Sequence, residues 1–222
     1  MKFKKIIVDY VVNYVQIARM PRVSTAKVRL TDAAMEMIWE NSYGSTSVDA
    51  ICEKAGVKKG SFYYFFKSKS ELAAAALDAD WNKNRAKLDS IFSSTVPPLE
   101  RFKHYFEFSY EVLANIKREC GAVLGCPLCT LGSEVCTLDA VLGDKVQELL
   151  NRKLTYYESA IRDAHAQGLI YAPDPKAKAK ALFIYFQGAL AQARIENNEE
   201  IIREFYPSAL DLLGAGKVAA HA

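Results

Sequence analysis

The chain has 222 residues, of which half are hydrophobic and a quarter are charged, and its net charge is +3. This composition provides a real core for one large or two small domains, and it favours a soluble intracellular protein over a membrane protein. The charge is uneven, because residues 1–75 carry an excess of five positive charges and residues 76–222 an excess of two negative charges. A basic first third is typical of a chain that neutralises phosphate at one end.

Residues 1–24 are interpreted as an N-terminal extension. Three lysines precede an apolar run at residues 6–8, which mimics the start of a secretory signal, but Asp9 and Asn13 interrupt it and no small-x-small cleavage site follows. The run is also far too short to span a bilayer. Met20 is an alternative translation start, because the family-like pattern described below for residues 25–75 begins only after it. The functional alternative is an arm that reaches along DNA.

Residues 25–72 predict a three-helix domain that contains a helix-turn-helix. A helix over residues 25–39 would pack behind the other two. Thr46 or Ser47 can cap the next helix, because a hydroxyl accepts from the free N–H groups of the first turn. Gly56 then tolerates the positive φ of a tight turn. The apolar face of this second helix is made by Val48, Ile51, Cys52 and Ala55.

The third, short helix separates its side chains into two faces. Phe62, Phe65 and Phe66 fall at i, i+3 and i+4 and should face inward, which leaves Tyr63 and Tyr64 outward. The alternative is that the whole aromatic run is plain core. Five consecutive aromatic residues cannot all face inward on one short helix, however, so two of them must be exposed or bound.

The flanks of this helix favour a nucleic acid backbone. Gly60 has no side chain, so a sugar-phosphate backbone can approach closely. Ser68 and Glu71 form an S-x-x-E capping box for the helix that follows. Lys69 falls in the first turn of that helix, where free N–H groups also favour a phosphate.

The segment Gly-Val-Lys-Lys-Gly-Ser-Phe-Tyr-Tyr-Phe-Phe-Lys-Ser-Lys-Ser-Glu-Leu, residues 56–72, closely resembles the recognition segment of the TetR/AcrR family of bacterial transcriptional repressors. The resemblance extends back through Asp32-Ala33-Ala34 and covers about residues 25–75. It implies a recognition helix in the DNA major groove. The position of Tyr64 is often histidine in relatives, so this tyrosine should shift operator preference without abolishing binding. The expected DNA-binding residues are Thr46, Ser47, Lys58, Lys59, Gly60, Ser61, Tyr63, Tyr64 and Lys69.

The rest of the chain predicts helices without strand alternation. They cover about residues 69–93, 99–117, 138–167, 175–197 and 199–213, with a kinked or short-helix region at 121–132. The fold class is therefore all-α. Residues 25–72 form the helix-turn-helix domain, residues 73–213 a helical ligand-sensing and dimerisation domain, and residues 214–222 a flexible tail.

The expected sensing site is an apolar pocket with a few hydroxyl groups, which is the default for this architecture. Most of the aromatic residues concerned could equally be ordinary core, and nothing identifies the ligand. The expected pocket or sensor residues are Trp81, Phe102, Tyr105, Phe106, Tyr110, Cys126, Tyr156 and Phe183.

The cysteines offer a second kind of sensor. Four of the five lie within residues 120–136, and Cys126 and Cys129 form a C-x-x-C. A thiolate stabilised by Lys117, Arg118 or a helix start could react with oxidants or electrophiles. The alternative is that these side chains are small, soft hydrophobes that pack a crowded bend. A zinc site would ordinarily pair two such units or use nearby histidines, so no metal and no cofactor is expected.

Helices 175–197 and 199–213 are the expected dimer elements. Two such helices from each subunit would make a four-helix bundle, as the resemblance to TetR-like proteins implies. The alternative is that the same apolar residues bury the helix within its own subunit. The expected interface residues are Phe186, Ala189, Leu190 and Ala193.

These patterns predict a homodimeric, cytoplasmic repressor that binds a double-stranded DNA operator and is released by a small-molecule inducer. An alternative is a regulator that senses oxidants or electrophiles through Cys126 and the neighbouring cysteines. An enzyme is not expected, because the sequence contains no G-x-S-x-G elbow, no glycine-rich phosphate loop and no H-E-x-x-H. A helical thiol enzyme and an architectural DNA binder are the alternatives from other classes.

Overall fold

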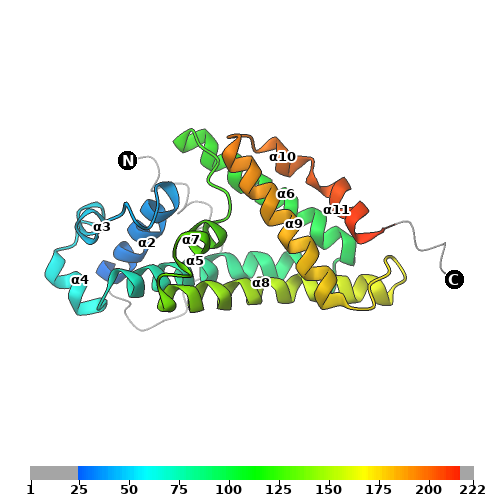
Figure 1. The fold of residues 1–222 in the computed structure, drawn as a ribbon, viewed down its shortest axis with the longest axis horizontal. Coiled ribbons are helices and arrows are strands. Elements are labelled where there is room, and N and C mark those ends of the chain that lie inside the picture. Colours follow the sequence, from blue (N-terminus) through cyan, green and yellow to red (C-terminus); the bar gives the residue numbers. More distant parts are fainter. Residues whose placement is uncertain (1–24, 216–222) are drawn as a thin grey trace. The chain divides into compact units, whose positions relative to one another are not determined.

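The computed structural model describes residues 25–215, so the predicted N-terminal extension and most of the predicted tail lie outside the described residues. All regular structure in this range is helical, which confirms the predicted fold class (Figure 1). The helices are α2 (Thr25–Glu40), α3 (Val48–Ala55), α4 (Lys59–Phe65), α5 (Lys69–Ile91), α6 (Pro98–Cys120), α7 (Pro127–Val135), α8 (Ala140–Ala166), α9 (Pro175–Ile195), α10 (Glu200–Arg203) and α11 (Phe205–Leu213).

The described residues form two compact units. The first unit contains residues 25–84 and 130–146, and the second contains residues 85–129 and 147–215. Helices α5, α7 and α8 each contribute residues to both units. The first unit therefore combines the helix-turn-helix region with a segment that lies far along the chain.

Local chemistry sets the start and the end of α3. Ser47 Oγ accepts a hydrogen bond from the N–H of Ala50 at 3.1 Å, so Ser47 is the N-cap of this helix. Gly56 ends the helix in the left-handed region with a φ of 61°. The fully buried side chains of Leu30, Ile51 and Phe62 then join α2, α3 and α4 in one core.

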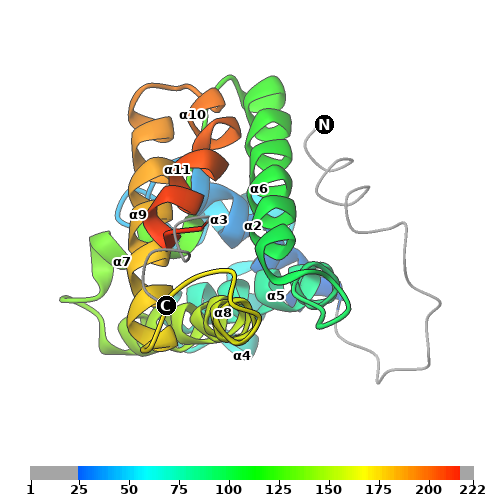
Figure 2. The same cartoon turned by 90° about the vertical axis from the view of Figure 1, so that its right-hand side faces the viewer.

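The core of the second unit is aromatic. Helices α6, α9, α10 and α11 pack together in this unit, as Figure 2 shows. Phe106 is the central contact, because its ring lies 4.6 Å from that of Phe186 and 4.9 Å from that of Phe205, centroid to centroid. Such pairs contribute beyond the apolar area that they bury. The same cluster includes Phe92, Phe102, Tyr105, Tyr157 and Phe183.

One charged residue is fully buried in the second unit. The Arg101 side chain is 2% exposed, its Nη1 lies 2.6 Å from Asp163 Oδ2, and its Nε donates to the carbonyl oxygen of Val96 at 2.8 Å. A buried guanidinium is tolerated only when its donors are satisfied in this way. The pair joins α6 to α8 within the second unit.

The predicted single helix over residues 199–213 is wrong, because the structure divides it into α10 and α11 at Glu204. The cause is Pro207, whose ring has no N–H and would clash with the carbonyl group four residues earlier, at Arg203. The preceding helix also ends at Ile195 rather than at Asn197, which adopts a positive φ of 49°. Asparagine accepts this conformation more readily than most residues.

Candidate nucleic-acid interface

Helix α4 has one anchored face and one open face. Phe62 is fully buried, and Phe66, which follows the helix, is 3% exposed. Tyr63 and Tyr64 are 56% and 82% exposed. The Tyr63 ring packs edge-on against Phe62 with centroids 5.0 Å apart, so it is supported although it is exposed. The expected division of faces is therefore present, with Phe65 half-buried between them.

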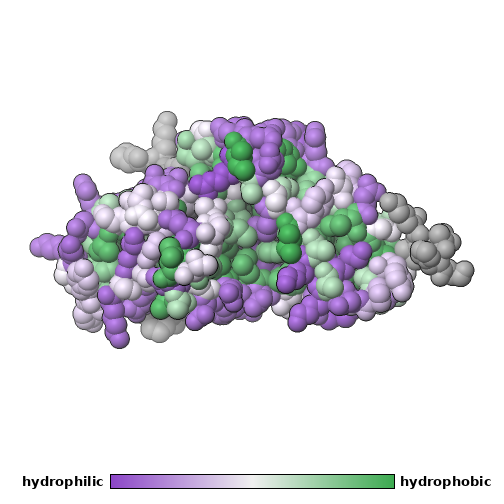
Figure 3. All heavy atoms as spheres, in the orientation of Figure 1, coloured by the Kyte–Doolittle hydropathy of each residue, from purple (hydrophilic) through white to green (hydrophobic). Residues whose placement is uncertain are grey.

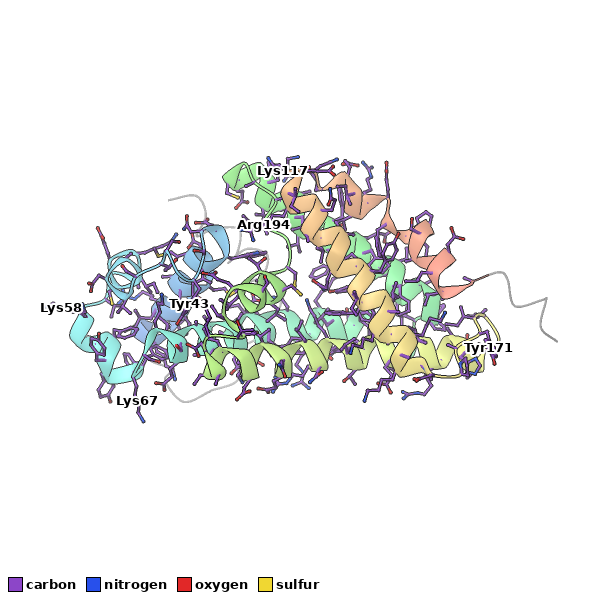
Figure 4. All side chains as sticks on the ribbon, in the orientation of Figure 1. Tyr43, Lys58, Lys67, Lys117, Tyr171 and Arg194 are labelled. Atoms are coloured by element: carbon purple, nitrogen blue, oxygen red, sulfur yellow. The ribbon has the colours of Figure 1, made fainter. Side chains whose placement is uncertain are left out.

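The start of α4 leaves room for a close partner. A Cβ added at Gly60 would meet no heavy atom within 4 Å, and Ser61 beside it is half-buried. Lys58 is the N-cap residue and uses no side-chain cap hydrogen bond. Lys58 and Lys67 are both exposed and lie on either side of α4 (Figure 4). Hydrophilic side chains project from the surface in this part of the first unit (Figure 3).

Lys59 is held by a neighbouring carboxylate. Its Nζ lies 2.7 Å from Asp49 Oδ1, and both side chains are more than half exposed. The hydrogen bond to Asp49 raises the pKa of Lys59. An exposed ion pair contributes little to stability. A phosphate can therefore compete with Asp49 for the ammonium group without a large loss in folding.

Lys69 is partly used inside the first unit. Its Nζ donates to the carbonyl oxygen of Tyr43 at 2.8 Å and to that of Thr46 at 3.0 Å, and it lies 4.0 Å from the centroid of the Tyr43 ring. Burial lowers the pKa of Lys69. An ammonium group has three donors, so one remains for a further acceptor.

The two hydroxyl residues before α3 differ in environment. Thr46 is 3% exposed, and its Oγ1 donates to the carbonyl oxygen of Ser42 at 2.7 Å. Ser47 is exposed and caps α3. The Thr46 side chain is thus committed to the α2–α3 loop, whereas Ser47 lies at the surface.

A carboxylate from α7 binds the backbone of the α2–α3 loop. Glu134 Oε2 accepts from the N–H of Tyr43 at 3.0 Å, and Glu134 Oε1 accepts from the N–H of Gly44 at 2.6 Å. Both N–H groups lie between helices, so neither has a helical carbonyl group as its acceptor, and Glu134 takes that place. Hydrogen bonds of this charged type are stronger than neutral ones. The loop before the helix-turn-helix is therefore held by a residue ninety positions away.

A second set of contacts joins the same loop to α5. The Tyr43 hydroxyl lies 3.1 Å from Ser70 Oγ, and Ser70 Oγ donates in turn to Asp139. Asp139 also accepts from the N–H of Leu142 at the start of α8. Burial is the largest of the effects that raise the pKa of Tyr43. Residues 134–139 therefore contact both the loop and the first turn of α5 within the first unit.

The expected pocket residues do not all come together. Phe102, Tyr105, Phe106 and Phe183 belong to the aromatic core of the second unit. By contrast, the Tyr110 hydroxyl donates to Glu200 at 2.9 Å and the Tyr156 hydroxyl to Asp89, so both are engaged with carboxylates. Trp81 is buried in the first unit.

Cys126 lies just before α7 and is buried. A hydrogen bond from the Cys129 side chain is the largest of the effects that lower the pKa of its thiol to about 5, and the charge of Lys153 acts in the same direction. Two backbone N–H groups, of Leu128 and Cys129, add to this shift. These contacts oppose the effect of burial, which by itself would raise the pKa of this thiol.

The expected dimer residues lie mostly on the inner face of α9. Phe186, Leu190 and Ala193 are buried within the subunit, and Ala189 is half-buried. The opposite face exposes large apolar side chains, because Ile184 is 59% and Ile195 is 77% exposed. Phe186, Leu190 and Ala193 are thus buried within their own subunit, which is the alternative given in the sequence analysis.

Sequence reasoning missed several residues of this region. Lys67 was overlooked although it is a lysine directly after the aromatic run. Glu134 and Asp139 carried no signal, since their partners lie 90 and 69 positions away.

A short helix that is anchored by phenylalanines, flanked by lysines and preceded by a tight turn defines a helix-turn-helix DNA-binding protein. A family model described as bacterial regulatory proteins of the tetR family matches residues 30–76, and one described as the tetracyclin repressor-like C-terminal domain matches residues 98–208. The chain belongs to the TetR family of transcriptional regulators.

Relatives support this assignment. The transcriptional regulator AcuR of Cereibacter sphaeroides is 31% identical over 192 residues, which cover 83% of this chain and 84% of that protein. The transcriptional repressor DhaR of a Mycobacterium species is 26% identical over 180 residues, or 79% of this chain and 86% of that one. A regulatory protein TetR from Rhodobacter sphaeroides has a solved structure that superposes with a TM-score of 0.75 at 29% identity, covering 84% of this chain and 97% of that one.

A further solved structure resembles this one in fold alone. Reduced NemR of Escherichia coli superposes with a TM-score of 0.72 at 18% identity, covering 86% of this chain and 98% of that one. No helix between residues 25 and 215 combines the length and hydrophobicity of a transmembrane span. Over the same residues, no group of three or more histidine, cysteine or carboxylate side chains is placed to hold a metal ion.

Proposed function

We propose that this chain is a homodimeric, cytoplasmic repressor that binds a double-stranded DNA operator and leaves it when a small molecule binds. The observation that carries the proposal is α4, whose buried phenylalanines hold two exposed tyrosines beside Lys58 and Lys67. A rigid helix with such a face fits the major groove. The named relatives are also transcriptional regulators.

The contacts divide into two classes. Lys58, Lys59 and Tyr63, with Lys67 added by its exposure, bind phosphates and set the register of the protein on DNA. The one remaining donor of Lys69 can join them. Ser61 and Tyr64 reach base edges and carry the sequence preference. Gly60 lets the phosphate backbone come close to α4.

The dimer is proposed to form through the outer face of α9. Ile184 and Ile195 are exposed there, and a Cβ added at Gly188 between them would meet no heavy atom within 4 Å. Small residues allow two helices to approach closely, and the isoleucines supply apolar area. The exposed stripe consists of Ala181, Ile184, Gly188, Ala191 and Ile195.

The test is the selection of duplexes from a random library by the full-length protein, followed by gel shifts. The expected operator is an inverted repeat whose half-sites lie about one helical turn apart. The logarithm of its association constant should fall linearly with the logarithm of salt concentration. Enrichment of no sequence, or equal affinity for every duplex, would show an architectural binder instead.

A second candidate is a thiol-responsive repressor, which the environment of Cys126 favours. A peroxide would accept two electrons and two protons from Cys126 and Cys129, so that one S–S bond forms and two waters are released. Hydrogen peroxide should then release the operator from the wild-type protein but not from Cys126→Ser. Release from both proteins, or from neither, would reject this candidate and leave the inducer-released repressor.

A further inference from the structure

One peptide group of the α2–α3 loop is bonded at both ends by charged side chains. It joins Tyr43 to Gly44. The N–H of Gly44 donates to Glu134 Oε1 at 2.6 Å. The carbonyl oxygen of Tyr43 accepts from Lys69 Nζ at 2.8 Å. All four residues belong to the first unit. Because the N–H and C=O of a trans peptide group point in opposite directions, the carboxylate and the ammonium group lie on opposite sides of it.

The polarity of this arrangement strengthens both hydrogen bonds. The peptide dipole turns its positive N–H end to the carboxylate and its negative C=O end to the ammonium group. Hydrogen bonds in such a chain polarise one another. Burial lowers the pKa of Lys69, and the charge of Glu134 opposes this shift. Loss of the Glu134 charge therefore weakens the hold of the loop on Lys69.

Further contacts fix the place of the Lys69 ammonium group. It also donates to the carbonyl oxygen of Thr46 at 3.0 Å and lies 4.0 Å from the centroid of the Tyr43 ring. The ring is held in turn by its hydroxyl, which lies 3.1 Å from Ser70 Oγ. Two of the three ammonium donors thus point to the loop, which sets the direction of the third. The Lys69 side chain is only half-buried, so an anion can reach this donor.

The pair of Lys59 and Asp49 shows a different use of a carboxylate. Asp49 binds the Lys59 ammonium group itself at 2.7 Å, so it competes with a phosphate for that group. Glu134 instead bonds the opposite end of a peptide group that Lys69 also bonds. It can therefore support Lys69 without taking the place of a phosphate.

We propose that Glu134 is a positioning residue for DNA binding, which acts through the Tyr43–Gly44 peptide group to hold the Lys69 ammonium group against a phosphate of the duplex. The inference rests on the proposed function, because it adds a residue to the same DNA interface. A carboxylate thereby strengthens the binding of a polyanion. Electrostatics alone predicts the reverse, since removal of a negative charge from a DNA-binding unit reduces repulsion. The sign of the effect decides between the two.

The experiment replaces Glu134 by its uncharged isostere. Glu134→Gln and the wild type are compared by gel shifts on the selected operator over a range of salt concentrations. The variant should bind about tenfold more weakly, and its slope of log association constant against log salt should be smaller by roughly one, as if a lysine were lost. Asp144→Asn, which neutralises an exposed carboxylate of the same unit, is the matched control. It should keep the slope and bind at least as tightly as the wild type.

A double-mutant cycle tests whether Glu134 acts through Lys69. Lys69→Gln should lower the affinity and the salt slope in the same way. Glu134→Gln added to Lys69→Gln should then change the affinity by less than about twofold, because the two residues share one effect. If Glu134 only stabilised the fold, Glu134→Gln would lower the fraction of active protein and leave the salt slope unchanged. The slope of Glu134→Gln decides by itself if Lys69→Gln does not fold.

Hydrogen exchange in the protein without DNA measures the peptide group directly. The Gly44 N–H should exchange about tenfold faster in Glu134→Gln and in Lys69→Gln, since each variant releases one end of the same group. Asp144→Asn should leave this rate unchanged. A protein that shows this coupling but binds no duplex would refute the proposed function. A protein that binds its operator equally well with and without the Glu134 charge would refute only this inference.

Three further results would overturn the positioning role of Glu134. The first is tighter operator binding by Glu134→Gln than by the wild type. The second is a salt slope of Glu134→Gln equal to that of the wild type. The third is a loss of affinity from Glu134→Gln that persists in full in the Lys69→Gln background.

Discussion

The N–H of Gly44 donates to Glu134 Oε1 at 2.6 Å, and a Cβ added at Gly44 would lie only 3.1 Å from the same oxygen. A side chain at position 44 would therefore push this carboxylate oxygen back by a few tenths of an ångström. The second oxygen of Glu134 binds the N–H of Tyr43. One side chain thus fixes two consecutive peptide groups directly before the DNA-reading helices.

Loss of this carboxylate should weaken the first unit. We expect Glu134→Ala to lower the free energy of unfolding by about 1–3 kcal/mol, because two N–H groups lose a charged acceptor. Urea unfolding followed by circular dichroism measures the change. Asp144→Ala removes an exposed carboxylate from the same unit and should change stability by less than about 0.5 kcal/mol. Equal effects of the two variants would contradict the role of Glu134.

Tyr64 should carry base preference. Tyr64→Ala is expected to change the ranking of operator variants, since an exposed side chain in the groove reads base edges. Each base that it discriminates should lose about 1–3 kcal/mol of preference. Competition gel shifts against a panel of single-base operator variants measure this. A uniform loss for all variants would mean that Tyr64 contacts only the backbone, and Tyr171→Ala in the second unit should leave the ranking unchanged.

Lys58 and Lys69 should behave differently. Lys58→Ala should weaken all duplexes alike and reduce the slope of log association constant against log salt by roughly one. It should leave stability unchanged, because Lys58 makes no cap hydrogen bond. Lys69→Ala should in addition destabilise the fold, since its ammonium group binds two carbonyl oxygens. If the salt slope of Lys58→Ala equals that of the wild type, Lys58 does not contact a phosphate.

The Cys126 thiol should make stability depend on pH. Its folded pKa is lowered to about 5, whereas an unfolded thiol titrates near about 8.5, so its contribution is fully present above about pH 8.5 and is lost as pH falls through 5. The loss of stability in Cys126→Ala should therefore grow as pH rises from 5 to 8. Val123→Ala, which removes a buried neighbour without a titrating group, should show a constant loss. A constant loss in both variants would exclude a stabilised thiolate.

The two faces of α9 should separate folding from association. Ile184→Glu places a charge in the exposed apolar stripe and should convert the proposed dimer to a folded monomer, as light scattering would show. Phe186→Ala removes a fully buried ring and should destabilise the subunit by about 3–5 kcal/mol. A dimer that survives Ile184→Glu would place the interface elsewhere.

Much of the first unit could be predicted because its signals are local. Phe62 and Tyr64 sit on opposite faces of α4 through helical spacing alone, and the cap and the turn of α3 follow from Ser47 and Gly56. The contacts of Glu134 could not be predicted, because no local pattern identifies a partner 90 residues away. The hydrogen bonds of Lys69 could not be predicted either, because its partners are backbone carbonyl groups, which every residue has.

In the second unit, composition did not decide which way the helices face. α9 is apolar on both sides, and only the packed core shows that Phe186 faces inward and Ile184 outward. The break at Pro207 was visible in the sequence and was overlooked.

The space beside Gly60 is open in the folded subunit, so the fold itself does not require a glycine there. Within the folded subunit nothing opposes a methyl group there, and in a helix alanine is favoured over glycine by roughly 0.5–1 kcal/mol. The free protein by itself would thus tolerate a larger residue at this point. A larger residue at position 60 therefore measures how closely a bound duplex approaches α4, without disturbing the subunit that binds it.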